Sequence, residues 1–223
     1  MGREGGYAFK DFPHSSHRRL LALVPPAPVK ILDVGTAHGY LGAALAAMGH
    51  TVVGIEADAE AARAAAAHYA AIYCEDVARH PRLAEVPFDV VVAADVLEHL
   101  ADPAATLRWL VGLLAPGGRI LVSVPNVAFL TVRLGLLVGR FEYQPRGILD
   151  RTHLRFFTRR SLFALLRDGG LRPRRVFSVP PPLPLLIPAT ARWPLRVVLE
   201  VAALWARLWP GLFAYQFVVE AEP

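Results

Sequence analysis

Two carboxylates and two imidazoles occupy positions where they could move a proton or hold a metal ion. Asp95, Glu98 and His99 directly follow an apolar run at residues 88–93, and His153 lies in a second polar stretch. If a helical turn begins at Asp95, these three side chains share one face, because positions i, i+3 and i+4 of a helix coincide. Glu98, His99 and His153 are therefore candidate catalytic residues. Together with Asp95 they are also candidate ligands for a divalent metal such as Mg²⁺.

The chemistry of these side chains allows three interpretations. His99 or His153 can act as a general base and remove a proton from a bound hydroxyl. A metal ion can have the same effect by lowering the pKa of that hydroxyl. Alternatively, Glu98 and His99 anchor the turn after a strand, and His153 belongs to a structural ion-pair network with Asp150 and Arg151.

A second set of residues has the spacing of a nucleotide site. Asp33 ends the apolar run at residues 30–34, and Gly35 and Gly39 follow in the next turn, where the missing Cβ lets a ligand approach the backbone. Glu56 ends the next apolar run, where a carboxylate can bind both hydroxyls of a ribose. Asp76 follows the third run and is then expected beside an adenine.

The elements that must position these groups are short apolar runs alternating with helical patterns. This alternation is typical of a parallel sheet built from βαβ units. It predicts an α/β fold with a single doubly wound, mainly parallel, seven-stranded sheet and helices on both faces. The strands are expected at residues 30–34, 51–56, 71–74, 88–93, 119–124, 174–179 and 215–220. We expect one domain over residues 1–223, with a cofactor half at about 15–125 and an acceptor half at about 126–223.

Helices are expected between these strands. Residues 40–48 and 59–70 are rich in alanine, which favours helix. A third helix should begin after Asp102 and continue through Leu114, ending at the Pro-Gly-Gly of residues 116–118. Thr158 or Ser161 should cap a fourth helix, which stops at residues 169–170.

The dinucleotide fingerprint of a nicotinamide dehydrogenase is not met. It would need glycines where Ala37 and Tyr40 stand. A Tyr-x-x-x-Lys pair is also excluded, because lysine occurs only at positions 10 and 30.

Residues 29–170 resemble the class I S-adenosylmethionine-dependent methyltransferases, whose first motif has an acidic residue and alternating glycines at the end of the first strand. One position departs from this motif, because Ala37 stands where the family usually has its central glycine. The resemblance implies S-adenosylmethionine as cofactor. It assigns these binding residues: Asp33, Gly35 and Gly39 at the methionine end, Glu56 at the ribose, Asp76 at the adenine and Asp95 at the inner edge.

Residues 95–100 resemble the ubiquinone-biosynthesis type of O-methyltransferase. Their acidic-x-x-Glu-His spacing is also similar to small-RNA terminal-ribose methyltransferases, in which such residues hold a metal. Residues 149–158 look like bacterial methyltransferases found among cell-surface glycan genes. The resemblance implies O-methylation of a small-molecule or glycan hydroxyl. The alternatives are an inactive methyltransferase-fold scaffold and an RNA terminal-ribose methyltransferase, although a nucleic-acid partner is not expected, because the sequence contains no recognised RNA-binding module.

Composition limits the class of protein. The 223 residues are 54% hydrophobic and 19% charged, which excludes disorder by low hydrophobicity for most of the chain. The first ten residues lack the layout of a signal peptide, and the single cysteine, Cys74, fits a reducing compartment. We therefore expect a cytoplasmic protein.

The segment Trp193 to Trp209 is expected to form a mostly apolar helix. Its charged residues lie close to one narrow stripe, while leucine, valine and tryptophan occupy the rest. Such a helix is buried in a core or contacts a membrane surface or a partner. One possible partner is therefore a membrane surface, contacted peripherally through Trp193–Trp209.

Overall fold

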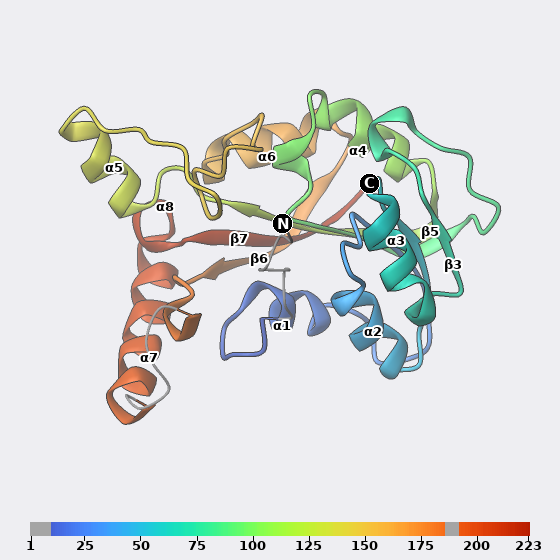
Figure 1. Cartoon of the computed structure of the whole chain (residues 1–223), viewed down its shortest axis with the longest axis horizontal. Coiled ribbons are helices and arrows are strands. Elements are labelled where there is room, and N and C mark those ends of the chain that lie inside the picture. The colour runs from blue at the N-terminus through green and yellow to red at the C-terminus, as the bar shows by residue number, and fades with distance from the viewer. Residues whose placement is uncertain (1–9, 186–191) are drawn as a thin grey trace.

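The computed structural model describes residues 10–185 and 192–223, with side chains left out for residues 185 and 192–196 (Figure 1). Seven strands form one sheet in the order β3-β2-β1-β4-β5-β7-β6, in which β7 runs antiparallel to both of its neighbours. The predicted mainly parallel, seven-stranded α/β fold is confirmed. The strands are β1 (Lys30–Val34), β2 (Thr51–Ile55), β3 (Ala71–Tyr73), β4 (Phe88–Ala94), β5 (Leu114–Pro125), β6 (Arg172–Val179) and β7 (Gln216–Glu222).

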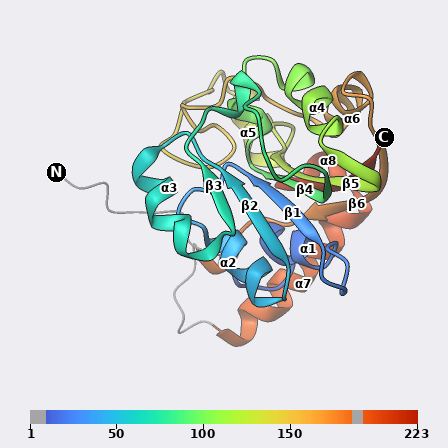
Figure 2. The ribbon, with the colours of Figure 1, turned by 90° about the vertical axis from the view of Figure 1, so that its right-hand side faces the viewer.

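Helices cover both faces of the sheet (Figures 1 and 2). On one face lie α1 (Ser16–Leu21), α2 (Tyr40–Ala47) and α7 (Arg192–Leu208), and on the other lie α4 (Pro103–Val111) and α6 (Arg159–Asp168). The remaining helices are α3 (Ala59–Ala65), α5 (Leu130–Leu137) and α8 (Pro210–Phe213), with short 3₁₀ turns η1 (Ala66–His68), η2 (Val77–Arg79), η3 (Leu97–His99) and η4 (Leu183–Leu185). Among the described residues, no helix has the length and apolar character needed to cross a bilayer.

The central strands are apolar on both sides because both faces are covered. In β4, Val91 and Ala93 pack in the cluster that contains the leucines of α4 and α6. Val90 and Val92 point to the opposite face and pack with the leucines of α1 and α2. Each of these four side chains is at most 1% exposed. The sheet is therefore a rigid support for the loops at its carboxyl edge.

The predicted end of the helix after Asp102 is wrong. The helix after Asp102 stops at Val111, because the chain must turn at Gly112 so that Leu114 can pair with Phe88 at the start of β5. The Pro-Gly-Gly at residues 116–118 consequently lies within a strand and not at a helix end.

The helix predicted at residues 59–70 is also shorter than expected. Helix α3 ends at Ala65, and a 3₁₀ turn follows at Ala66–His68. This turn brings Tyr69 inward, where its hydroxyl reaches the Asp33 carboxylate. A long-range contact thus overrides the local helix preference of the alanines.

Candidate active site

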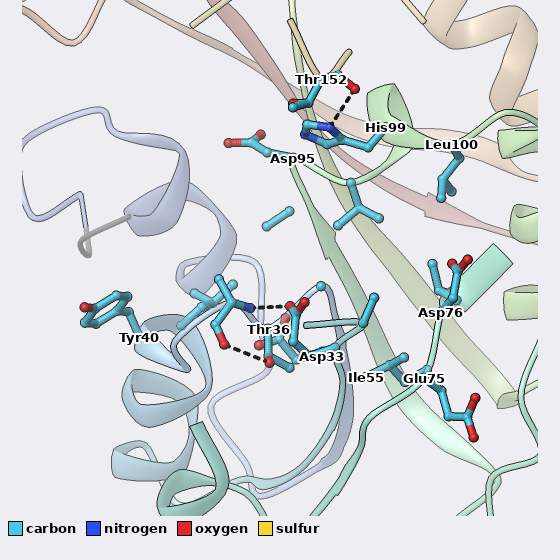
Figure 3. Close-up of a pocket in the computed structure, with 18 of the residues that line it drawn as sticks. Asp33, Thr36, Tyr40, Ile55, Glu75, Asp76, Asp95, His99, Leu100 and Thr152 are labelled. Carbon is cyan, nitrogen blue, oxygen red and sulfur yellow. Dashed lines mark hydrogen bonds between the residues drawn. The ribbon is translucent and has the colours of Figure 1, made fainter. Parts of the chain in front are cut away.

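A cavity of about 470 Å³ opens at the carboxyl ends of β1, β2 and β4 (Figure 3). Open α/β sheets place ligands at this edge. Six of the predicted site residues line the cavity: Asp33, Gly35, Glu56, Asp76, Asp95 and His99. The other three, Gly39, Glu98 and His153, lie outside its lining.

Asp33 is the most deeply buried carboxylate in the cavity wall, with 2% of the residue exposed. The Tyr69 hydroxyl donates a hydrogen bond to it at 2.6 Å. Burial raises the pKa of Asp33 to about 7, against the lowering effect of the Tyr69 hydrogen bond and with a further raising effect from the Glu56 charge. A cationic group bound in the cavity would therefore favour the ionised form of the Asp33 carboxyl at neutral pH.

Tyr69 is a site residue that sequence reasoning missed. Its ring fills the space beside three glycines, since a Cβ added at Gly42 would lie 2.1 Å from the ring and one at Gly54 would lie 3.0 Å away. A Cβ at Gly39 would lie 2.9 Å from Ala65 and 3.2 Å from the ring. Gly39 thus makes room for packing behind the site, and does not line the cavity.

Glu56 connects the two turns at the carboxyl ends of β1 and β2. Its carboxylate accepts hydrogen bonds from the backbone N–H groups of Ala37 at 2.8 Å and Asp58 at 2.9 Å. Gly35 in the first turn has φ +70°, and an added Cβ would lie 2.7 Å from a methyl group of Val96. The turn after β1 is therefore held close to the cavity by a carboxylate that also faces into it.

Ala37, the departure from the methyltransferase motif, has a left-handed backbone with φ 46°. This conformation costs an L-residue roughly 1–2 kcal/mol, whereas glycine adopts it freely. We expect Ala37→Gly to raise stability by about 0.5 kcal/mol after the extra unfolded-state entropy of glycine is subtracted. Thermal unfolding measures this change. The matched control is Ala44→Gly within α2, which should lower stability by about 1 kcal/mol; an equal loss in both variants would contradict the prediction.

Asp95 also lines the cavity, and its carboxylate makes long-range contacts. Its carboxylate forms an ion pair with the Lys10 ammonium at 3.1 Å and accepts hydrogen bonds from the Ser123 hydroxyl and the Gln216 amide. Burial raises the pKa of Asp95, but the Lys10 charge and the Ser123 hydrogen bond outweigh it, so that the pKa lies below its usual value. Asp95 is therefore an anion at neutral pH.

The predicted shared face of residues 95, 98 and 99 does not form. Asp95 has φ 57°, because its N–H bonds to Ser123 across the sheet, and the helical turn η3 begins only at Leu97. Asp95 therefore falls outside the group of potential metal ligands, which consists of Glu98, His99 and His153 among the described residues.

Lys10 and His17 are further lining residues that sequence reasoning missed. The Lys10 backbone N–H donates to His17 Nδ1 at 3.1 Å. Burial and the Lys10 charge lower the pKa of His17 to about 4, so this imidazole is neutral at physiological pH. No local motif marks either residue, because they approach the cavity from a segment far from Asp95 in the sequence.

Backbone carbonyls orient the rings of His99 and His153. His99 Nδ1 lies 3.2 Å from the Thr152 carbonyl oxygen, and His153 Nδ1 lies 3.0 Å from the Ile148 carbonyl oxygen. A carbonyl only accepts, so each Nδ1 carries a proton, and in the neutral form of either ring the Nε2 lone pair would be left for an acceptor proton or a metal. The rings meet edge to face with centroids 4.8 Å apart. His99 borders the cavity and His153, 8% exposed, lies behind it.

Glu98 completes this cluster. One potential ligand atom each from Glu98, His99 and His153 lies within 4.8 Å of the other two. Glu98 is 1% exposed, and both of its carboxylate oxygens lack a hydrogen-bond partner. Burial and the Asp95 charge raise the pKa of Glu98 well above its usual value, and burial lowers the pKa of His153. A buried carboxylate without donors requires either a proton or a cation.

The fold agrees with comparisons to known proteins. A model described as a methyltransferase domain matches residues 7–176. A ubiquinone biosynthesis O-methyltransferase from Caulobacter vibrioides is 32% identical over 181 residues, which cover 77% of this chain and 69% of that protein. The corresponding protein of Caulobacter sp. strain K31 is 34% identical over 132 residues, 56% of this chain. That match spans about half, 51%, of the length of the Caulobacter sp. relative.

The fold is also found in solved structures. The N-methyltransferase NodS from Bradyrhizobium japonicum, in complex with S-adenosylhomocysteine, superposes with a TM-score of 0.60 at 17% sequence identity. The match covers 95% of this chain and 88% of NodS. The family match, the relatives and the seven-stranded sheet agree: the chain belongs to the methyltransferase domain family, as a class I S-adenosylmethionine-dependent member.

Proposed function

We propose that the protein transfers the methyl group of S-adenosylmethionine to a hydroxyl oxygen of a small acceptor, such as a phenol or a sugar. The observation that carries the proposal is that His99 lines the same cavity as Asp33, Glu56 and Asp76. The O-methyltransferase relatives support the choice of oxygen. The acceptor class comes from chemistry, because the imidazole of a histidine is the commonest general base for removal of a hydroxyl proton.

The residues present fit the cofactor. Asp33 and Gly35 would hold its methionine end, Glu56 its ribose and Asp76 its adenine. Gly35 supports this assignment, since a side chain there would meet Val96 and crowd the cavity. S-adenosylmethionine supplies an already activated sulfonium methyl group, so the protein has only to orient the acceptor oxygen and remove its proton.

Cofactor binding is expected to release a proton from Asp33. Its pKa of about 7 means that the carboxyl is partly protonated at pH 7, and a bound ammonium group favours the ionised form. Affinity for S-adenosylhomocysteine should therefore rise from pH 5.5 to 7, with release of about half a proton at pH 7. Calorimetry in phosphate and Tris buffers measures this release. Equal heats in both buffers, or the same pH dependence in Asp33→Asn, would contradict the assignment.

The three side chains behind the acceptor end also fit a divalent metal. Each imidazole donates its Nδ1–H to a backbone carbonyl, which is the usual outer support of a metal-bound histidine. The buried Glu98 carboxylate, without donors, would gain a partner. As the alternative to direct proton removal by His99, we propose that Glu98, His99 and His153 hold the ion. A bound metal would supply a Lewis acid that lowers the pKa of the acceptor hydroxyl.

Glu98→Gln tests this proposal through stability. Without metal, the raised pKa of Glu98 means that the folded state binds more protons than the unfolded state above pH 4.5, so its contribution to stability falls as pH rises. The variant should then melt about 5 °C higher than the wild type at pH 8, and the gap should shrink towards pH 5.

Added Mn²⁺ or Zn²⁺ should reverse the order at pH 8, by raising the melting temperature of the wild type but not of Glu98→Gln. His68→Ala, which changes a histidine outside the cluster, should keep the metal response of the wild type. If no divalent ion shifts the wild type, the metal is excluded and direct proton removal by His99 remains.

The function itself is tested with S-adenosylmethionine carrying a ¹³C-labelled methyl group and a panel of catechols, phenols and sugars. We expect one class of acceptor to gain the label on oxygen, with stoichiometric S-adenosylhomocysteine. A label found on nitrogen or carbon would overturn the assignment to hydroxyls. We further propose a cytoplasmic reaction, which the lone, exposed thiol of Cys74 supports.

A further inference from the structure

The outward face of α7 is apolar. Leu199 and Ala206 mark its inner side, with 5% and 0% exposed. On the opposite side, Val201, Leu204 and Leu208 follow helical spacing and are 47%, 53% and 65% exposed. A surface helix normally places its polar residues there. The polar residue Glu200 lies on the flank of α7 instead, and its carboxylate is 3.1 Å from Nε2 of His14, which precedes α1.

Helix α5 exposes a second group of apolar side chains. Leu134 and Leu136 are each 52% exposed, and Leu137 and Val138 reach 81% and 70%. Only Val132 of this helix is buried. Apolar exposure of this extent in consecutive residues is unusual for a face in contact with water.

These two groups lie at the same end of the molecule. Helix α8 begins directly after α7, and Arg133 of α5 donates a hydrogen bond to the Gly211 carbonyl oxygen in α8 at 3.5 Å. Figure 1 shows α5, α8 and α7 along the left-hand end, and Figure 2 shows the same end turned away from the viewer. We call the exposed apolar residues of α5, Val138 and residues 197–209 the α5–α7 surface.

The charges on these segments are mainly positive. Residues 130–146 and 197–209 contain four arginines against the two glutamates 142 and 200. The arginines are all exposed: Arg133, Arg140, Arg146 and Arg207. Trp205 and Trp209, 45% and 62% exposed, add amphipathic rings. Apolar side chains, tryptophan and arginine together are the composition of an interfacial membrane helix.

We propose that the α5–α7 surface binds the face of an anionic lipid bilayer. The leucines, valines and tryptophans would enter the boundary between headgroups and acyl chains, and the arginines would meet lipid phosphates. A second copy of this chain is the less suitable occupant, because a two-fold interface sets the same surface against itself and brings arginines against arginines. The segment 138–152 connects this surface to Thr152, which lines the cavity.

Co-sedimentation with vesicles tests the proposal on the full chain. We expect the wild type to bind vesicles of phosphatidylcholine with phosphatidylglycerol about tenfold more tightly than phosphatidylcholine alone, and salt to reduce the difference. The double variant Leu204→Glu/Leu208→Glu should lose binding without unfolding, because both side chains are exposed. The matched control, Met48→Glu/Val86→Glu, changes two side chains that are each 43% exposed outside this surface and should bind as the wild type.

Three results would overturn the proposal. The wild type could remain in the supernatant with both vesicles, or the control pair could lose binding as fully as the α5–α7 pair. Light scattering could instead reveal a dimer that dissociates in Leu204→Glu/Leu208→Glu and does not bind lipid, which would assign the surface to a second copy of the chain.

Discussion

Replacement of Glu56 by alanine is expected to lower the affinity for S-adenosylhomocysteine by about 100-fold or more, since two hydrogen bonds to a charged group are lost at about 1.5–3 kcal/mol each. The carboxylate already holds the N–H groups of Ala37 and Asp58. It has roughly four acceptor positions, so it can bind both ribose hydroxyls as well. Isothermal titration calorimetry measures the loss.

Two further variants identify the cause. Glu56→Gln keeps one acceptor oxygen and should bind with intermediate affinity. Glu60→Ala removes an exposed carboxylate in the first turn of α3 and should bind as the wild type. Undiminished binding by Glu56→Ala would show that the cofactor occupies a different part of the cavity.

Replacement of His99 by alanine is expected to slow methyl transfer by about 10²–10⁴-fold, the usual contribution of a general base. Affinity for S-adenosylhomocysteine should stay unchanged, because Asp33, Glu56 and Asp76 remain in place. Single-turnover rates with the labelled cofactor and an acceptor from the screen measure the effect. Added imidazole should restore part of the rate, since it can enter the space left by the ring.

His68→Ala serves as the control, because His68 lies in η1 and does not line the cavity. If His99→Ala weakens cofactor binding as much as it slows transfer, His99 supports the cavity and does not take up the proton. If the rate is retained, the base must be sought elsewhere in the lining.

The strands could be predicted from sequence because a parallel strand buried on both faces must be continuously apolar. The runs at residues 30–34 and 88–93 come close to this condition, apart from Lys30, Asp33 and Asp89, and they lie where β1 and β4 are found. The ends of α3 and α4 could not be predicted in the same way. They depend on Tyr69 reaching Asp33 and on Leu114 pairing with Phe88, and neither contact leaves a local pattern.

The candidate site likewise has residues that a local pattern predicts and residues that long-range contacts place. Asp33 and Glu56 stand at the carboxyl ends of two predicted parallel strands. Their place in the cavity follows, because open α/β sheets bind ligands at that edge. Asp95 was expected to share one face with Glu98 and His99, yet its carboxylate is held by Lys10, Ser123 and Gln216 and stays outside that group. The three glycines that make room for the Tyr69 ring were the only sequence feature that could have indicated it. They are distant from Tyr69 in the sequence, so the contact is evident only in the folded chain.

The position of β7 between β5 and β6 has a consequence during synthesis. Strand β6 can join the sheet only after segment 180–215 and β7 have left the ribosome, which takes seconds at about 5–20 residues per second. By then β1 to β5, with Asp33 and Glu56, are available to collapse. Gln216 of β7 reaches Asp95 last. The nascent chain can therefore assemble the turns that carry Asp33 and Glu56 before the Asp95 carboxylate receives its hydrogen bond from Gln216.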